Sequence, residues 1–175
     1  MNLEYQQLID PELSGDSRVW VYQSNRLFNL SEALSLEKEL DDFTKQWTSH
    51  GAKLKAAAYL FFGQFIILIA DESSDRVSGC STDHSVHFIQ SIEKEYGVQL
   101  MDRTTLAFLL KDKVQLLPLS QLPYAIEHGF VGPATIYFNN LVSNLNQLKN
   151  DWIIPAGRSW LTKRIPSLAI SETAE

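Results

Sequence analysis

Cysteine is almost absent from this chain of 175 residues, in which Cys80 is the only one. A single thiol forms no disulfide within the chain, so the sequence favours a reducing compartment. Proline and glycine are also sparse, at six and eight residues, which excludes collagen-like and Pro/Gly-rich disordered chains. Hydrophobic residues make up 45% of the chain, which is the ordinary share for a globular protein with a substantial core.

Positive charge and long apolar runs are scarce as well. The formal net charge is -6, so we expect no broad phosphate-binding surface and no nucleic-acid partner. The longest apolar stretch, from Ala56 to Ala70, is interrupted by Gly63 and Gln64 and is too short to span a membrane. The segment Met1 to Tyr5 lacks the basic start and apolar core of a secretory signal. The sequence therefore predicts a cytoplasmic protein without direct membrane insertion.

Hydrophobic periodicity predicts both helices and strands. Strands are expected where β-branched and aromatic residues run together, and helices where large apolar residues recur every three or four positions. The predicted strands are 19–22, 56–62, 65–70, 104–110, 114–117 and 135–138. The predicted helices are one that includes 36–47 and ends before Gly51, one from 81–83 to Gly97, and shorter ones at 122–128 and 143–149.

The order strand–helix–strand–strand–helix–strand over residues 18–117 is typical of the split βαβ, or ferredoxin-like, pattern. It predicts an α+β sandwich in which two helices cover one face of an antiparallel sheet. Residues 118–165 are interpreted as a small C-terminal extension packed on this core. Residues 1–17 are expected to form a loosely held N-terminal arm, and residues 166–175 to fray.

Polar and reactive side chains are densest at the start of the second predicted helix, where Cys80 follows a buried strand. Free backbone N–H groups and the positive end of a helix dipole lie at such a position. The split βαβ topology brings the loop that holds His50 to the same end. His50 as the base, with Asp83 or Asp71 as its orienting acid, would make a thiolate nucleophile of Cys80. In the alternative interpretation Cys80 is a small buried filler and Asp83 a helix cap.

The same corner also has the composition of a ligand-binding site for a small anion. The backbone at Gly79 and the hydroxyls of Ser81, Thr82 and Ser85 are the groups that surround a phosphate or carboxylate at a helix N-terminus. Ordinary helix capping accounts for the same residues, so both interpretations stay open.

Motifs for nucleotide and metal chemistry are incomplete. Phe65 to Glu72 has the pattern of a Walker B strand, but the chain contains no Gly-Lys pair and hence no phosphate-binding P-loop. P-loop ATP hydrolysis is therefore not expected. His84 and His87 lie three residues apart, which differs from the four-residue spacing of H-E-x-x-H. We expect neither a metal ion nor a cofactor.

Four segments of the chain carry a resemblance to known proteins. They are Trp20–Arg26, Trp47–Gly51, Gly79–Ile89 and Phe138–Val142. Together they resemble a family of small bacterial proteins that are often labelled "ABC transporter ATPase", and the resemblance covers most of residues 18–165. It carries over no fold, substrate or catalytic residue, and the label implies at most an accessory protein linked to an ABC transport ATPase.

These patterns together predict a non-catalytic cytoplasmic binding or protein-interaction module. The expected partner is another protein, a small anionic ligand, or a second copy that docks through an open sheet face or edge to give a homodimer. The alternatives are a thiol-dependent enzyme that uses Cys80 and an accessory protein of an ABC transport ATPase.

Overall fold

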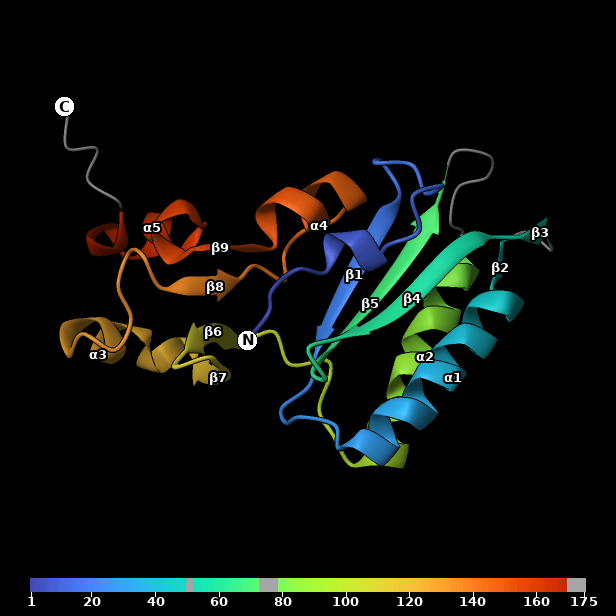
Figure 1. Cartoon of the computed structure of the whole chain (residues 1–175), viewed down its shortest axis with the longest axis horizontal. Coiled ribbons are helices and arrows are strands. Elements are labelled where there is room, and N and C mark those ends of the chain that lie inside the picture. The colour runs from blue at the N-terminus through green and yellow to red at the C-terminus, as the bar shows by residue number, and fades with distance from the viewer. Residues whose placement is uncertain (50–51, 73–78, 170–175) are drawn as a thin grey trace. The chain divides into compact units, whose positions relative to one another are not determined.

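A computed structural model describes residues 1–49, 52–72 and 79–169 (Figure 1). Helices and antiparallel sheets occur together in it, which confirms the predicted α+β class. The chain divides into two compact units. The larger unit comprises Leu3–Asp102 and Asn140–Lys149, and the smaller unit comprises Arg103–Asn139 together with the residues from Asn150 onward and the first two residues. No helix in the described ranges is long and apolar enough to cross a membrane.

The larger unit is built on a three-stranded sheet. Its strands are β1 (Arg18–Gln23), β4 (Lys55–Phe61) and β5 (Phe65–Asp71), in the order β1-β5-β4. Both pairings are antiparallel, so β1 and β4 run parallel with β5 between them. This is the split βαβ arrangement that the sequence predicts for these three strands. A second, two-stranded pairing joins β2 (Thr48–Ser49) to β3 (Ala52–Lys53).

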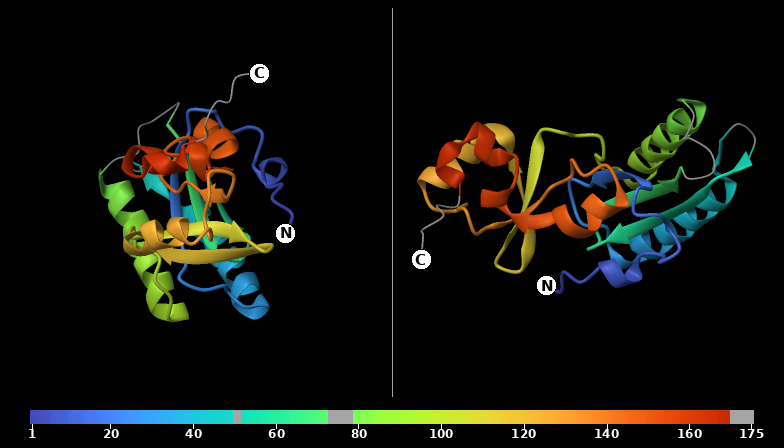
Figure 2. Two further views of the ribbon diagram at one scale, coloured as in Figure 1. Left: turned by 90° about the vertical axis from the view of Figure 1, so that its left-hand side faces the viewer. Right: turned by 90° about the horizontal axis from the view of Figure 1, so that it is seen from above.

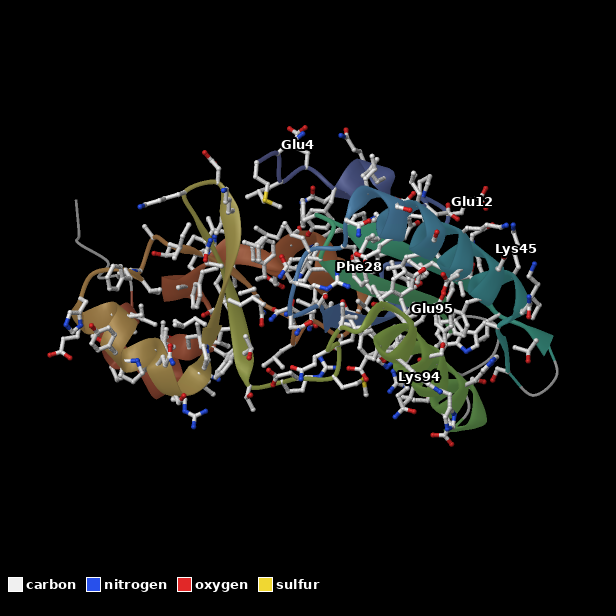
Figure 3. All side chains as sticks on the ribbon, turned by 90° about the horizontal axis from the view of Figure 1, so that it is seen from below. Glu4, Glu12, Phe28, Lys45, Lys94 and Glu95 are labelled. Carbon is white, nitrogen blue, oxygen red and sulfur yellow. The ribbon has the colours of Figure 1, made fainter. Side chains whose placement is uncertain are left out.

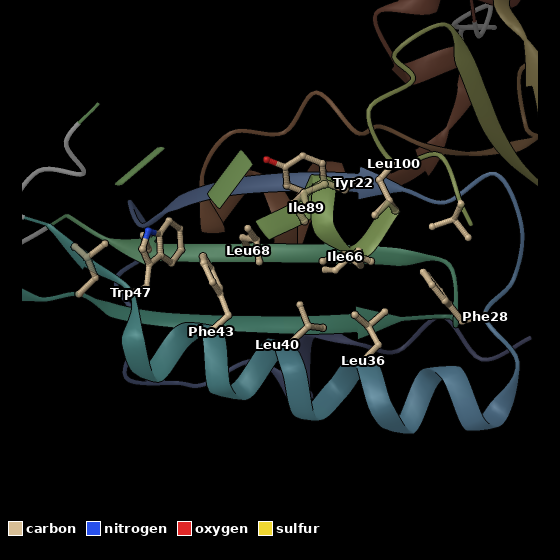
Figure 4. Packing of buried hydrophobic residues seen from close by; sticks show 14 residues of the cluster. Tyr22, Phe28, Leu36, Leu40, Phe43, Trp47, Ile66, Leu68, Ile89 and Leu100 are labelled. Carbon is tan, nitrogen blue, oxygen red and sulfur yellow. The ribbon is translucent and has the colours of Figure 1, made fainter. Parts of the chain in front are cut away.

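Helices α1 (Leu30–Gln46) and α2 (Gly79–Tyr96) cover one face of this sheet (Figure 1). The side chains of Leu36, Leu40, Phe43 and Trp47 point from the α1 segment toward the strands, as their spacing predicts (Figure 4). Charged side chains such as Lys45 on α1 and Lys94 on α2 are exposed instead (Figure 3).

The bounds of α1 differ from those that the sequence predicts. The helix begins two turns earlier because Asn29 forms a capping box: its side chain accepts the N–H of Glu32 at 2.9 Å, and Glu32 accepts the N–H of Asn29 at 2.8 Å. It ends at Gln46, and Trp47 already has an extended backbone. Leu30 and Leu34 in the first turns are exposed and interrupt the amphipathic pattern, so the periodicity of apolar residues does not indicate this start.

The opposite face of the sheet is covered by residues 3–17, which are bonded in turn to α4 (Leu145–Asp151). The structure differs here from the predicted loose arm, because Tyr5, Ile9 and Leu13 are buried. The Tyr5 hydroxyl donates a hydrogen bond to the carbonyl of Leu148, and the Tyr5 ring packs on Phe61 at 5.4 Å between ring centroids. The arm is thus part of the core, and β5 is buried on both faces.

The smaller unit is built on a second antiparallel sheet. Its strands are β6 (Thr105–Leu110), β7 (Lys113–Pro118), β8 (Ile136–Phe138) and β9 (Ile153–Pro155), in the order β7-β6-β8-β9. The ferredoxin-like prediction needed β6 as a fourth strand of the first sheet. In the structure β6 pairs with β7 on one side and β8 on the other, so both of its edges are occupied within the smaller unit.

The unit boundary follows from the same pairing. Because β6 belongs to the second sheet, the smaller unit begins at Arg103 and not at residue 118, and 140–149 return to the larger unit. Short helices α3 (Leu122–Glu127) and α5 (Leu161–Arg164) complete the smaller unit. Figure 2 shows β6 and β7 as a long two-stranded ribbon.

The smaller unit has its own hydrophobic core. Phe108, Leu122, Tyr137 and Leu161 are buried in it. The indole N–H of Trp160 donates to the Tyr137 hydroxyl at 3.1 Å. Burial raises the pKa of Tyr137 to about 12, and the bond from Trp160 opposes part of that rise. Tyr137 therefore stays protonated at neutral pH.

Candidate functional site

The predicted corner at the start of α2 is described in part. His50 and the side chain of Cys80 lie outside the described residues, so their pairing as base and nucleophile stays a prediction. Asp83, the fifth residue of α2, is exposed, and Gly79 is exposed with open space where a side chain would begin. In the part of the chain that the structure describes, no group of three His, Cys, Asp or Glu side chains is placed to hold a metal ion.

Two serines of this corner are bonded into the fold. The buried Ser81 hydroxyl donates to the carbonyl of Thr48 at 2.7 Å, and the indole N–H of Trp47 donates to the Ser81 carbonyl at 3.0 Å. The buried Ser85 hydroxyl donates to the carbonyl of Thr82, also at 2.7 Å. A hydroxyl has one proton to donate, and an anion must accept one. These contacts favour a structural role for Ser81 and Ser85.

The smaller unit contains a pocket that the sequence analysis did not anticipate. It has a volume of about 290 Å³ and lies between the hairpin β6–β7, α3 and the segment that follows α3. Phe108 and Leu117 line it from the hairpin, Tyr124 from α3, and Phe130 and Val131 from the following segment. Small-molecule sites occupy about 300–1,000 Å³, so this pocket suits one or two side chains of a partner better than a cofactor.

Exposed aromatic rings stand at this pocket. Tyr124 is 60% exposed and Phe130 is 61% exposed, although both are large apolar side chains. The ring of His128 stacks on Tyr124 with 3.9 Å between centroids and lies nearly parallel to Phe130 at 6.5 Å. Aromatic side chains in such positions are enriched at protein interfaces, because they bury a large area at little cost in conformational entropy.

Strand β7 forms the edge of the sheet beside the pocket. A two-residue turn joins β6 to β7, with positive φ at Lys111 and Asp112 as in a type I′ hairpin. In such a hairpin the flanking residues exchange both of their hydrogen bonds, and bonded and non-bonded pairs then alternate along the ladder. The N–H of Leu119 donates to the carbonyl of Thr104 at 2.8 Å, which is the position that this alternation requires.

The alternation decides which backbone groups of β7 are open. Lys113, Gln115 and Leu117 bond to β6, so the N–H and C=O groups of Val114 and Leu116 point away from it. No other strand among the described residues pairs with β7 on that side. An open strand edge beside an apolar pocket is the arrangement by which extended peptides are bound through strand addition.

The sequence indicates the strand and the turn of this edge, but not its pairing. The strand at 114–117 and the turn at Lys111–Lys113 are both predicted from the sequence. An exposed lysine at the start of a strand and a proline at its end, as in Lys113 and Pro118, are typical of edge strands. Which side of the strand stays open is settled only by pairing with β6.

Comparisons with protein-family models, with curated protein sequences and with solved structures found no match for this chain. The resemblance to proteins labelled as ABC transporter ATPases therefore stays a prediction.

Proposed function

We propose that this protein is a non-catalytic protein-interaction module of the cytoplasm that binds an extended segment of a protein partner. The binding surface is the open edge of β7 together with the pocket beside α3. The single observation that carries the proposal is that β7, whose Val114 and Leu116 backbone groups point outward, also lines the pocket through Leu116 together with exposed Tyr124 and Phe130.

Each component supplies a different part of the binding energy. The backbone of a partner strand would exchange hydrogen bonds with Val114 and Leu116, each bond contributing about 0.5–1.5 kcal/mol. An apolar side chain in the pocket would remove the aromatic rings from water, at about 25 cal/mol per Å² of buried apolar surface. Because a side-chain pocket alone has few polar groups, the strand edge is what would orient the partner.

Leu116→Pro tests the backbone part. Its N–H points away from β6, so proline removes an outward donor and leaves the ladder to β6 intact. The matched control is Leu116→Ala, which shortens the same side chain and keeps the N–H. Near-UV circular dichroism and thermal melting would establish that both variants fold.

The probe is a random octapeptide library selected on the immobilised wild-type protein. Kd values of the selected peptides are then measured by fluorescence anisotropy. We expect Leu116→Pro to weaken binding about tenfold or more, and Leu116→Ala, which trims one residue of the pocket lining but keeps the N–H, to weaken it less. Selected peptides that bind Leu116→Pro as tightly as wild type, or a selection that yields no binder, would overturn the proposal.

A further inference from the structure

The register of β7 dictates which side chains of a bound strand reach the pocket. Residues that lie opposite each other in a sheet project from the same face. Lys113, Gln115 and Leu117 share a face with Phe108, which lines the pocket. Partner residues opposite these three positions would therefore face α3, and the intervening residues would face away.

The pocket face is apolar at one end of β7. Leu117 lines the pocket from the strand, and Tyr124 and Phe130 stand exposed across from it. Gln115, next along the same face, also lines the pocket. Partner residues opposite Gln115 and Leu117 would thus meet aromatic and aliphatic carbon, which favours large apolar side chains at both positions.

The other end of that face is positive. Lys113 is exposed at the start of β7, and in the adjoining turn the Asp112 carboxylate forms an ion pair with the N-terminal ammonium group of Met1 at 3.3 Å. Within 103–139 and 150–169, cationic side chains outnumber acidic ones, although the chain has a net charge of -6. The cations in these ranges are Arg103, Lys111, Lys113, Arg158, Lys163 and Arg164, and the acids are Asp112, Glu127 and Asp151.

In the two-fold register centred on Gln115, a second copy of this chain fits the edge less well. Two-fold antiparallel pairing of β7 with itself, centred on Gln115, would place Lys113 opposite Leu117 of the other copy. The ammonium group would then lie against an apolar side chain, with no acid to compensate it. An acidic side chain opposite Lys113 would instead compensate the charge of the ammonium group.

Building on the proposed function, we propose that the occupant of the β7 edge is an antiparallel strand with an acidic end. Read from its N-terminus, the strand has the pattern apolar–x–apolar–x–acidic. The two apolar residues lie opposite Leu117 and Gln115, and the acidic residue lies opposite Lys113. Antiparallel pairing continues the direction of the sheet, in which every described pairing is antiparallel.

Three fluorescein-labelled peptides test the pattern. Their sequences are SSLTLTESS, SSLTLTQSS and SSLTLTKSS, which differ only at the position opposite Lys113. We expect Kd to rise from the first to the third, by about fivefold in total, and the difference to shrink as salt is added. The variant Lys113→Glu should reverse the order, and Lys163→Glu, a matched change elsewhere in the smaller unit, should leave it unchanged.

The outcomes separate this inference from the proposed function. Equal Kd values for the three peptides, with binding still lost in Leu116→Pro, would overturn the acidic preference and leave strand binding standing. Failure of all three to bind up to about 1 mM would overturn the pattern, while library-selected peptides decide strand binding independently. A wild-type dimer in sedimentation velocity that becomes a monomer in Leu116→Pro would show that the occupant is a second copy.

Discussion

The two sheets of this protein are built from similar residues, but their strands differ in how far they are buried. In the larger unit all seven residues of β5 are buried, since helices α1 and α2 cover one face and residues 3–17, bonded to α4, cover the other. In the smaller unit β7 contains no buried residue: Val114, Leu116 and Leu117 are half-buried, and the other residues of the strand are exposed. A strand that is covered on both faces contributes to the core, whereas a strand with an open edge is available to bind a partner.

The edges of the sheets differ in the same way. A segment from far along the sequence returns to the free side of β1, where the N–H of Val19 donates to the carbonyl of Ser143 at 2.9 Å and Arg18 forms a bridge with Asn144. The N–H of Leu145 then donates to the carbonyl of Ser17 at 2.9 Å. No comparable segment in the described residues pairs with the outer side of β7. The chain covers the β1 edge of the first sheet and leaves the β7 edge of the second without a strand partner among the described residues.

The largest expected effect on stability comes from shortening one apolar side chain in each sheet. Ile67→Ala should lower the free energy of unfolding by about 2–5 kcal/mol, because Ile67 is fully buried in β5 and its removal leaves a cavity. Val114→Ala should cost less than about 1 kcal/mol, because Val114 is half-buried on the open edge. Urea unfolding followed by circular dichroism measures both, and equal losses would remove the distinction between the two sheets.

Tryptophan replacements give a second, smaller contrast. Trp47→Phe should destabilise by about 1–3 kcal/mol, because it leaves the buried Ser81 carbonyl without its indole donor. Trp160→Phe should cost less, since Trp160 is only half-buried and the Tyr137 hydroxyl that it bonds can turn. The measurement is the urea midpoint of each variant against wild type. A greater loss in Trp160→Phe would reverse the expected ranking.

The N-terminal arm offers a sharper test of how the larger unit is enclosed. Tyr5→Phe removes the hydroxyl that donates to the Leu148 carbonyl, and we expect a loss of about 1 kcal/mol. Amide hydrogen exchange should then rise in residues 5–13 and in α4, with Tyr59→Phe, which removes an acceptor for the arm at Asp10, as a companion variant. Unchanged exchange in both variants would restore the expectation of a loose arm.

The smallest expected effect is electrostatic. The hydrogen bonds from Arg26, followed by the backbone N–H of Asn29, lower the pKa of Glu32. A lowered pKa in the folded state stabilises the protein above the ordinary carboxyl pKa, and this contribution is lost as pH falls through the lowered value. Stability of wild type should therefore fall more steeply in acid than that of Glu32→Gln. Urea midpoints measured from neutral pH to about pH 3 test this, and parallel curves would contradict it.

Several elements could be predicted because their signals are local. The spacing of Leu36, Leu40 and Phe43 identified the buried side of α1, and the apolar run from Phe65 identified β5 as a fully enclosed strand. The turn at Lys111 and Asp112 was also recognisable from its residues. In each case the burial period or turn chemistry of a few neighbouring residues is enough to decide the structure.

Other features depended on contacts between residues far apart in the sequence. Tyr5, Ile9 and Leu13 lie in a polar segment without a strand or helix period, so their burial appears only once the uncovered face of β5 exists. At the predicted site, the hydroxyl of Ser81 could equally have faced a ligand, and its bond to the Thr48 carbonyl shows that it faces the fold. The role of such a side chain depends on which group the fold places next to it, and the local sequence does not specify that group.

By itself, the sequence determined the α+β composition, the inward-facing sides of α1 and β5, and the hairpin that joins β6 to β7. Those depend on side-chain period and backbone propensity, which act over a few residues. Only the tertiary structure decided that β6 joins β7 and β8 and not β1, and with it which backbone groups of Val114 and Leu116 stay open. Which strands pair depends on contacts between residues far apart in the sequence and on how the chain forms two separate cores. The proposed binding edge therefore follows from the fold and not from a motif.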